Sequence, residues 1–248
     1  MSSSIPSSAP KEPPSKGIWS AVAPYVAPPL SASAAIIPVF RDMVAKSAQQ
    51  VGNTIPSITF IEGVKRGAKA APTVGTIVGT QMIIQNIVEK ALVGDSNKPS
   101  LSSTFASSAI VGAVSAPVLA VFNGQTMGRG VRESLRKFSP MQGIAIAVQE
   151  TAFVIGLSVA DQVAIEMKKK FGDAKVVDYT AAFGAGAAGS LAGHPANTAL
   201  TRWQAGLKVN NFSQLMRGAV RKARAIGFFS VLYKFGKETL NPAFQSSK

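Results

Sequence analysis

Uncharged, mostly apolar stretches alternate with short basic segments along this chain. Apart from one histidine, six windows contain no charged residue: 70–88, 101–128, 138–149, 151–160, 179–201 and 225–233. A helix needs roughly 20 mostly apolar residues to cross a bilayer. Four of these windows reach that length, or nearly reach it when one acid is tolerated. The pattern therefore predicts a polytopic membrane protein.

Basic residues collect in the gaps between the windows, where they would form rims against anionic lipid head groups. The groups are Lys65, Arg66 and Lys69; Arg129, Arg132, Arg136 and Lys137; Lys168, Lys169 and Lys170; and Arg217, Arg221, Lys222 and Arg224. The alternative is a soluble bundle of buried helices with a nucleic-acid surface. That class interleaves basic and aromatic residues along an exposed face. Here the basic residues separate apolar runs instead, so we expect no nucleic acid partner.

The fold class expected from this pattern is an all-α membrane protein with six transmembrane helices. Because Pro24, Pro28 and Pro29 would interrupt a helix, we expect no continuous helix before Leu30. The Ser/Pro-rich segment 1–17 is expected to be a disordered tail, 18–241 a single membrane domain and 242–248 a short tail. The expected helices cover 30–47, 70–92, 103–128, 141–168, 179–206 and 221–239.

Composition narrows the chemistry that the chain can carry. Charged residues make up 15% of its 248 residues, yet the net charge is +14. The absence of cysteine excludes disulfides and thiolate metal sites. Because His194 is the one histidine, a metal cluster or a catalytic triad would depend on it alone. The sequence also has no phosphate-binding Gly-Lys-Ser/Thr loop and no paired catalytic carboxylates. We therefore expect no enzyme, no cofactor and no metal.

Three prolines at equal intervals indicate an internal repeat. Pro38, Pro117 and Pro195 are separated by 79 and 78 residues, and a run of small residues precedes each. A basic step and a further apolar stretch follow each proline, which suggests a triplicated two-helix unit. The repeats would cover 18–95, 100–172 and 175–241. Kinks at the three prolines would close a three-fold barrel at one end.

The third repeat resembles the mitochondrial carrier family. That family has Pro-x-(Asp/Glu)-x-x-(Lys/Arg)-x-(Lys/Arg)-x-Gln at the end of each odd helix, and Pro195, Arg202 and Gln204 match it. A step of the family's kind, Met216-Arg217-Gly218, follows. The second repeat keeps Pro117 and a nearby glutamine, and the first keeps its proline and Lys65-Arg66-Gly67. The resemblance implies three helix pairs and a multi-pass location in the mitochondrial inner membrane, although plastid and peroxisomal membranes also host such carriers.

The chain departs from the family at the gate. In carriers, acids and bases after each proline form a ring of ion pairs on the matrix side. Here the acid positions hold Phe40, Leu119 and Asn197, and the basic positions hold Met43, Phe122 and Leu200. An apolar plug resists cycling, because exposing it to water costs about 25 cal/mol per Å². At the opposite gate only Glu166-x-x-Lys169 fits the acid-x-x-base pattern without a shift.

Several residues are candidates for specific contacts. The steps Arg66-Gly67 and Arg217-Gly218 resemble the family's cardiolipin sites, where a phosphate meets a helix N-terminus. Acids are expensive inside a membrane helix, so Glu150 and Asp161 are expected to line a cavity or to pair. Their candidate partners are Arg202, Arg224 or another subunit, and Gln204 is a further candidate for a cavity or subunit contact. We expect His194 to hydrogen-bond a backbone carbonyl freed by the kink at Pro195.

Two main functions follow from these patterns. With the gate charges lost, the leading hypothesis is an accessory subunit of a larger inner-membrane complex, such as a respiratory or ATP-synthase assembly, with cardiolipin and other subunits as partners. The alternative is an atypical solute carrier, with a cavity lined by Gln81, Gln85, Gln149, Glu150 and Arg202. A third class is a membrane adaptor or insertase. A cavity lined by several basic and polar side chains would favour transport, and a filled cavity would favour the subunit.

Overall fold

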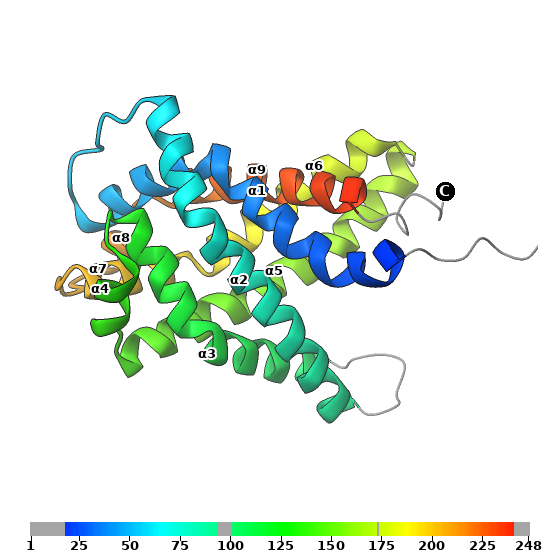
Figure 1. The fold of residues 1–248 in the computed structure, drawn as a ribbon, viewed down its shortest axis with the longest axis horizontal. Helices are drawn as coiled ribbons and strands as arrows, with labels where there is room; N and C mark the ends of the chain where they lie inside the picture. Colours follow the sequence, from blue (N-terminus) through cyan, green and yellow to red (C-terminus); the bar gives the residue numbers. More distant parts are fainter. Residues whose placement is uncertain (1–17, 94–100, 173, 241–248) are drawn as a thin grey trace, which may run out of the picture.

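The computed structural model describes residues 18–93, 101–172 and 174–240, and this part of the chain is entirely α-helical (Figure 1). The all-helical class is therefore confirmed. Within the described residues there are nine helices and no strand. The helices are α1 Ile18–Val51, α2 Phe60–Val93, α3 Leu101–Thr126, α4 Val131–Arg136, α5 Pro140–Phe171, α6 Lys175–Ala192, α7 His194–Gln204, α8 Phe212–Leu215 and α9 Ala219–Leu240.

Six long helices form a closed ring. Contacts run from α1 to α2, then to α3, α5, α6 and α9, and α9 packs back against α1. Figure 1 shows the blue start of α1 beside the red end of α9, where Trp19 Nε1 donates a hydrogen bond to the carbonyl oxygen of Leu240 at 3.1 Å. The short helices α4, α7 and α8 gather at the opposite end of the ring. The two ends of the ring are therefore built from different elements.

The first helix begins twelve residues earlier than expected. The prediction that no continuous helix forms before Leu30 is wrong, because α1 begins at Ile18 and contains Pro24, Pro28 and Pro29. Each interior proline costs a helix about 3 kcal/mol. α1 packs against both α2 and α9, and this packing supports the helix despite its prolines. Small side chains of α1 are fully buried, among them Ala23, Ala27 and Ala32.

The second helix also begins before its expected start at residue 70. The side chain of Thr59 caps α2 by accepting a hydrogen bond from the amide of Glu62 at 3.2 Å. Glu62 itself lies in the first turn, where a negative charge complements the helix dipole. Arg66 and Gly67 therefore lie inside α2 and do not open it. The expectation that this step marks a helix N-terminus is wrong.

The three repeat prolines have different effects on their helices. Pro195 follows a break at Gly193, so the expected helix 179–206 is divided into α6 and α7. Proline suits the first turn of α7, where its missing N–H has no helical partner in any case. Pro38 and Pro117 lie within α1 and α3, and both helices continue through them. A helix is thus interrupted only at the third proline.

Glycines allow neighbouring helices in the ring to approach closely, as the small-residue runs predict. A Cβ atom on Gly67 would lie 2.6 Å from the carbonyl oxygen of Ile37 on α1. On α6, a Cβ atom on Gly189 would lie 2.9 Å from the carbonyl oxygen of Phe153 on α5. Both distances are too short for any side chain, so larger residues at these positions would separate the helices.

Two helices of the described part are long and apolar enough to cross a bilayer. They are Ala21–Val51 of α1 and Phe105–Thr126 of α3, and less than half of each apolar window is buried within the protein. The sequence predicts six such helices. Residues 154–164 at the centre of α5 have no described side chains. By length and composition, the described residues thus contain two candidate spans.

Candidate functional site

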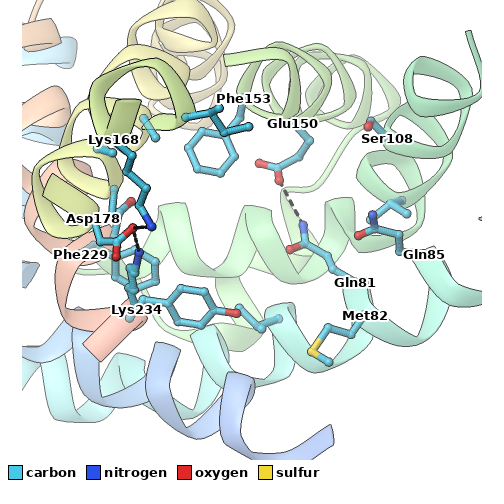
Figure 2. Close-up of a pocket in the computed structure, with 18 residues that line it drawn as sticks. Gln81, Met82, Gln85, Ser108, Glu150, Phe153, Lys168, Asp178, Phe229 and Lys234 are labelled. Atoms are coloured by element: carbon cyan, nitrogen blue, oxygen red, sulfur yellow. Dashed lines mark hydrogen bonds and ion pairs between the residues drawn. The ribbon is translucent and has the colours of Figure 1, made fainter. Parts of the chain in front are cut away.

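A cavity of about 700 Å³ lies between α2, α3, α5, α6 and α9 (Figure 2). Much of its wall is apolar, and several polar and charged side chains point into it from different helices. These side chains are Gln81, Gln85, Ser108, Glu150, Lys168, Asp178, Ser230 and Lys234. A mostly apolar cavity with a few converging polar groups is the usual form of a small-molecule site.

Glu150 is the acid at the inner part of this cavity. Its carboxylate accepts hydrogen bonds from Gln81 Nε2 at 3.1 Å and from Gln149 Nε2 at 3.2 Å. The expected pairing with Arg202 or Arg224 is wrong, since Arg202 bonds to backbone carbonyls and Arg224 pairs with Asp42. Neutral amides therefore bind both carboxylate oxygens directly, and Lys222 acts on the carboxylate electrostatically without an ion-pair contact. The other predicted acid, Asp161, lies on α5 among the residues whose side chains are outside the described part.

An ion cluster forms the rim of the cavity. Asp178 at the start of α6 pairs with Lys168 of α5 at 2.7 Å and with Lys234 of α9 at 3.3 Å. Each of these side chains is about a quarter to a third exposed. Glu166 and Lys169, which match the family's gate pattern, instead form an exposed pair within one helix. Sequence reasoning missed Asp178, because its partners lie on two other helices.

A smaller inner chamber of about 200 Å³ continues from this cavity toward the other end of the ring. The two spaces share lining residues, namely Val78, Gln81, Glu150, Phe153 and Phe229. The inner chamber is also lined by Lys46 of α1 and Lys222 of α9, both buried. Neither lysine was a candidate from the sequence, where Lys222 counted only as part of a basic rim.

Beyond the chamber, a buried network of hydrogen bonds joins α1, α3 and α7. Asn197 Oδ1 accepts hydrogen bonds from Lys46 Nζ at 3.0 Å and from Gln50 Nε2 at 3.1 Å. The hydroxyl of Thr201 donates to Gln50 Oε1 at 2.9 Å, and Asn123 Nδ2 lies 3.2 Å from the same hydroxyl. Apart from Lys46 the groups are neutral, so the network closes this end without ion pairs.

Residues at equivalent repeat positions contact one another in this network. The hydroxyls of Ser47 and Thr126 lie 2.7 Å apart, and these residues are separated by 79 positions in the sequence. Asn123 and Thr201 also bond, and they are separated by 78 positions. These separations equal the intervals between the repeat prolines. Equivalent positions that touch must lie near a common axis of the ring.

The positions of the missing gate charges lie next to this network. Phe40 and Phe122 contact each other edge to face, with ring centroids 6.3 Å apart. Phe40, Met43 and Leu200 are almost fully buried. The position predicted for an acid of the first repeat thus contacts, through two aromatic rings, the position predicted for a base of the second repeat. The closed end combines an apolar layer with a layer of neutral hydrogen bonds.

Arg202, Gln204 and His194 stabilise backbone at the closed end and do not line the cavity. The Arg202 guanidinium donates to the carbonyl oxygens of Gln50 at 3.1 Å and of Lys208 at 2.8 Å. Gln204 Nε2 donates to the Ala120 carbonyl oxygen at 3.0 Å. His194 Nε2 lies 2.9 Å from the carbonyl oxygen of Arg217, before α9. The expected partner of His194, a carbonyl freed by its own kink, is therefore wrong, because the ring crosses to another segment.

The predicted lipid-binding steps lie in two different environments. Arg66 forms an exposed ion pair with Glu62 inside α2, where backbone amides are already used by the helix. Arg217 is exposed, and Gly218 with φ +80° comes directly before the first residue of α9. Only the second step therefore has the helix N-terminus that a phosphate contact requires.

Comparison with models of known protein families gives no match. No curated protein matches the chain either. The resemblance to mitochondrial carriers therefore stays a prediction from the residues quoted above, and function has to be inferred from the site itself.

Proposed function

We propose that this chain is a membrane-embedded, carrier-like protein that admits a small polar solute to a central cavity. The observation that carries the proposal is the cavity of about 700 Å³ with Glu150 inside and Lys168, Asp178 and Lys234 at its rim. Charged groups between membrane helices are costly and usually functional. A cavity into which several basic and polar side chains project favours transport over a purely structural role.

Two further observations support a carrier-like architecture with six spanning helices in three pairs. The six long helices neighbour one another in chain order and close into a ring. Ser47 bonds to Thr126, its equivalent one repeat later. By the same proposal the chain lies in the mitochondrial inner membrane, where Arg217 and Gly218 at the start of α9 would contact cardiolipin.

The closed end can open without separating ion pairs. Hydrogen bonds between neutral groups are exchanged for hydrogen bonds to water at a net cost of about 0.5–1.5 kcal/mol each. The bonds of Gln50, Asn123 and Thr201 belong to this class. We infer that this network replaces the ion pairs of the gate, so that loss of the gate charges does not end the transport cycle.

An accessory subunit is the second candidate, and the apolar layer favours it. Phe40, Met43 and Leu200 would have to leave the core whenever the closed end opened. If that cost keeps the end shut, the protein would act as a fixed part of a larger inner-membrane complex. Mild-detergent native electrophoresis with mass spectrometry would then find it together with the subunits of that complex.

Cysteine labelling tests the proposal directly, because the native chain has no cysteine. Ala182→Cys places a thiol on the cavity wall, and Phe228→Cys places one on the half-exposed outer side of α9. Each variant is reconstituted in liposomes and treated with a membrane-impermeant maleimide from one side at a time. If the proposal holds, the cavity thiol reacts from both sides and the lipid-facing thiol does not react.

The other outcomes have distinct meanings. Reaction of the cavity thiol from one side only would contradict a transport cycle and would favour the accessory subunit. Equal reaction of both thiols in liposomes would contradict membrane embedding. Ala174→Cys, at an exposed position just before α6, reports the orientation of the protein in each liposome preparation.

A further inference from the structure

Two lysines meet the inner chamber with almost no exposure to bulk solvent. Lys46 is 3% exposed and Lys222 is 6% exposed. A buried ammonium group normally has a carboxylate partner, because otherwise its lost hydration is not compensated. Among the described residues, neither lysine has a carboxylate within ion-pairing distance, and Lys46 donates one hydrogen bond, to Asn197. Glu150 attracts Lys222 electrostatically from the opposite wall, but two lysines face this one acid, so one positive charge of the chamber is left without a partner.

The other polar groups of the chamber offset only part of the charge of the two lysines. The one acid of its lining is Glu150, and amide groups occupy its oxygens. An ammonium group has three donors. Lys222 donates none of its three to a described residue, and Lys46 uses one. Several N–H donors therefore remain for a ligand.

The chamber also contains an acceptor without a donor. Gln149 gives its amide N–H to Glu150 Oε1, and its own Oε1 is buried with no hydrogen-bond partner. Leaving a buried acceptor unsatisfied is costly. A ligand that fits the chamber must therefore offer negative oxygens to the lysines and an O–H to Gln149.

We propose that the inner chamber binds a compact oxyanion that carries a hydroxyl, such as hydrogen phosphate or a small hydroxy acid. The negative oxygens accept from Lys46 and Lys222, and the hydroxyl donates to Gln149 Oε1 or to Glu150. A volume of about 200 Å³ suits a small ion, since drug-sized ligands occupy pockets of about 300–1,000 Å³. This inference rests on the proposed function for its role, because it names the class of solute that enters the cavity.

Sulfate is the sharpest comparison with phosphate. The two anions share shape and charge, but at neutral pH phosphate retains a proton and sulfate has none. The full chain in detergent is unfolded by heat in phosphate, sulfate or chloride at equal ionic strength, with tryptophan fluorescence as the signal. A phosphate concentration about a hundred times its Kd is expected to raise Tm by roughly 5–10 °C. Sulfate and chloride are expected to raise it far less.

Three variants separate the parts of the site. Lys222→Met is expected to abolish the phosphate shift, because the ligand loses one of its two cationic donors. Gln149→Met keeps both lysines and is expected to narrow the gap between phosphate and sulfate. Lys65→Met, an exposed lysine on α2, is the matched control and should leave the shift unchanged.

Equal shifts in phosphate and sulfate, with no larger shift in glycolate, would overturn the proposal, as would a phosphate shift that survives in Lys222→Met. If Lys222→Met does not fold, the wild-type comparison and Gln149→Met decide alone. Glycolate, a small hydroxy acid, is tested in the same assay to distinguish a hydroxy acid from phosphate as the ligand. A larger Tm shift than that in sulfate, with either glycolate or phosphate, supports the site. Binding in detergent needs no transport. A Tm shift in phosphate combined with thiol labelling from one side only would therefore support the anion site and contradict the carrier. Thiol labelling from both sides without a Tm shift would support the carrier and contradict the anion site.

Discussion

The two ends of the helix ring are held by different chemistry. At the closed end α1, α3 and α7 meet through neutral groups such as Gln50, Asn123 and Thr201, which are at most 4% exposed. At the other end α5, α6 and α9 meet through Lys168, Asp178 and Lys234, which are about a quarter to a third exposed. Taking an ion out of water costs several kcal/mol, whereas a satisfied amide is buried at little cost. The ion pairs thus stay partly in water, whereas the closed end buries mainly neutral groups, and its cations Lys46 and Arg202 bond to an amide and to backbone carbonyls.

The largest change in the free energy of unfolding is expected from removing Gln50, which joins several groups of the hydrogen-bond network at the closed end. Gln50→Leu removes partners from Asn197, Thr198 and Thr201, all of which are buried. Leaving such groups unsatisfied should lower the free energy of unfolding by about 3 kcal/mol. Thermal unfolding in detergent measures the loss.

The neighbouring residue provides the control for this change. Gln49→Leu makes the same substitution at a half-buried position whose side chain forms no hydrogen bond with a described residue. Its effect should be well below that of Gln50→Leu. Equal losses from both variants would mean that the network does not hold the closed end.

A smaller change in the free energy of unfolding is expected from breaking the contact between Ser47 and Thr126, which lie at equivalent positions of the predicted repeats. Ser47→Ala and Thr126→Val each remove one side of the hydroxyl pair at 2.7 Å. In a double-mutant cycle the two changes should be non-additive by about 1 kcal/mol, because the second change finds the bond already lost. Additive losses would show that the contact contributes nothing, and Ser47→Ala with Thr151→Val offers a pair on separate parts of the ring for comparison.

The smallest change in the free energy of unfolding is expected at the end of the ring where α5, α6 and α9 meet. Asp178→Asn removes two ion pairs that water partly screens, so the free energy of unfolding should fall by at most about 1 kcal/mol, and less in high salt. Glu166→Gln, which removes an exposed pair within α5, is the matched control and should change Tm less. A loss at Asp178 as large as that at Gln50 would erase the difference between the two ends.

The long helices could be predicted from the sequence, but their ends could not. The uncharged windows identify the helices because apolar residues must be buried or face lipid. The rule that proline ends a helix failed for α1, since it ignores the packing of this helix against α2 and α9. The opposite error occurs at Pro195, because the expected helix 179–206 is divided there, after Gly193.

Much of the site was missed because its groups contact residues far away in the sequence. Arg202 was one of the candidate partners of Glu150, yet the two residues bond to different groups. One local signal was available for the closed end. Neutral polar residues recur three or four positions apart in otherwise apolar helices, as at Ser47 and Gln50 and at Asn123 and Thr126. That spacing places them on one helix face.

The contact between α1 and α9 makes the chain topologically circular. The Trp19 indole reaches the carbonyl oxygen of Leu240, so the first and last helices are neighbours like any other pair. A circular permutant with a linker between these ends and new termini at Gly172, between α5 and α6, would keep every helix neighbour of the ring. During synthesis, however, the ring cannot close until its last helix has been made.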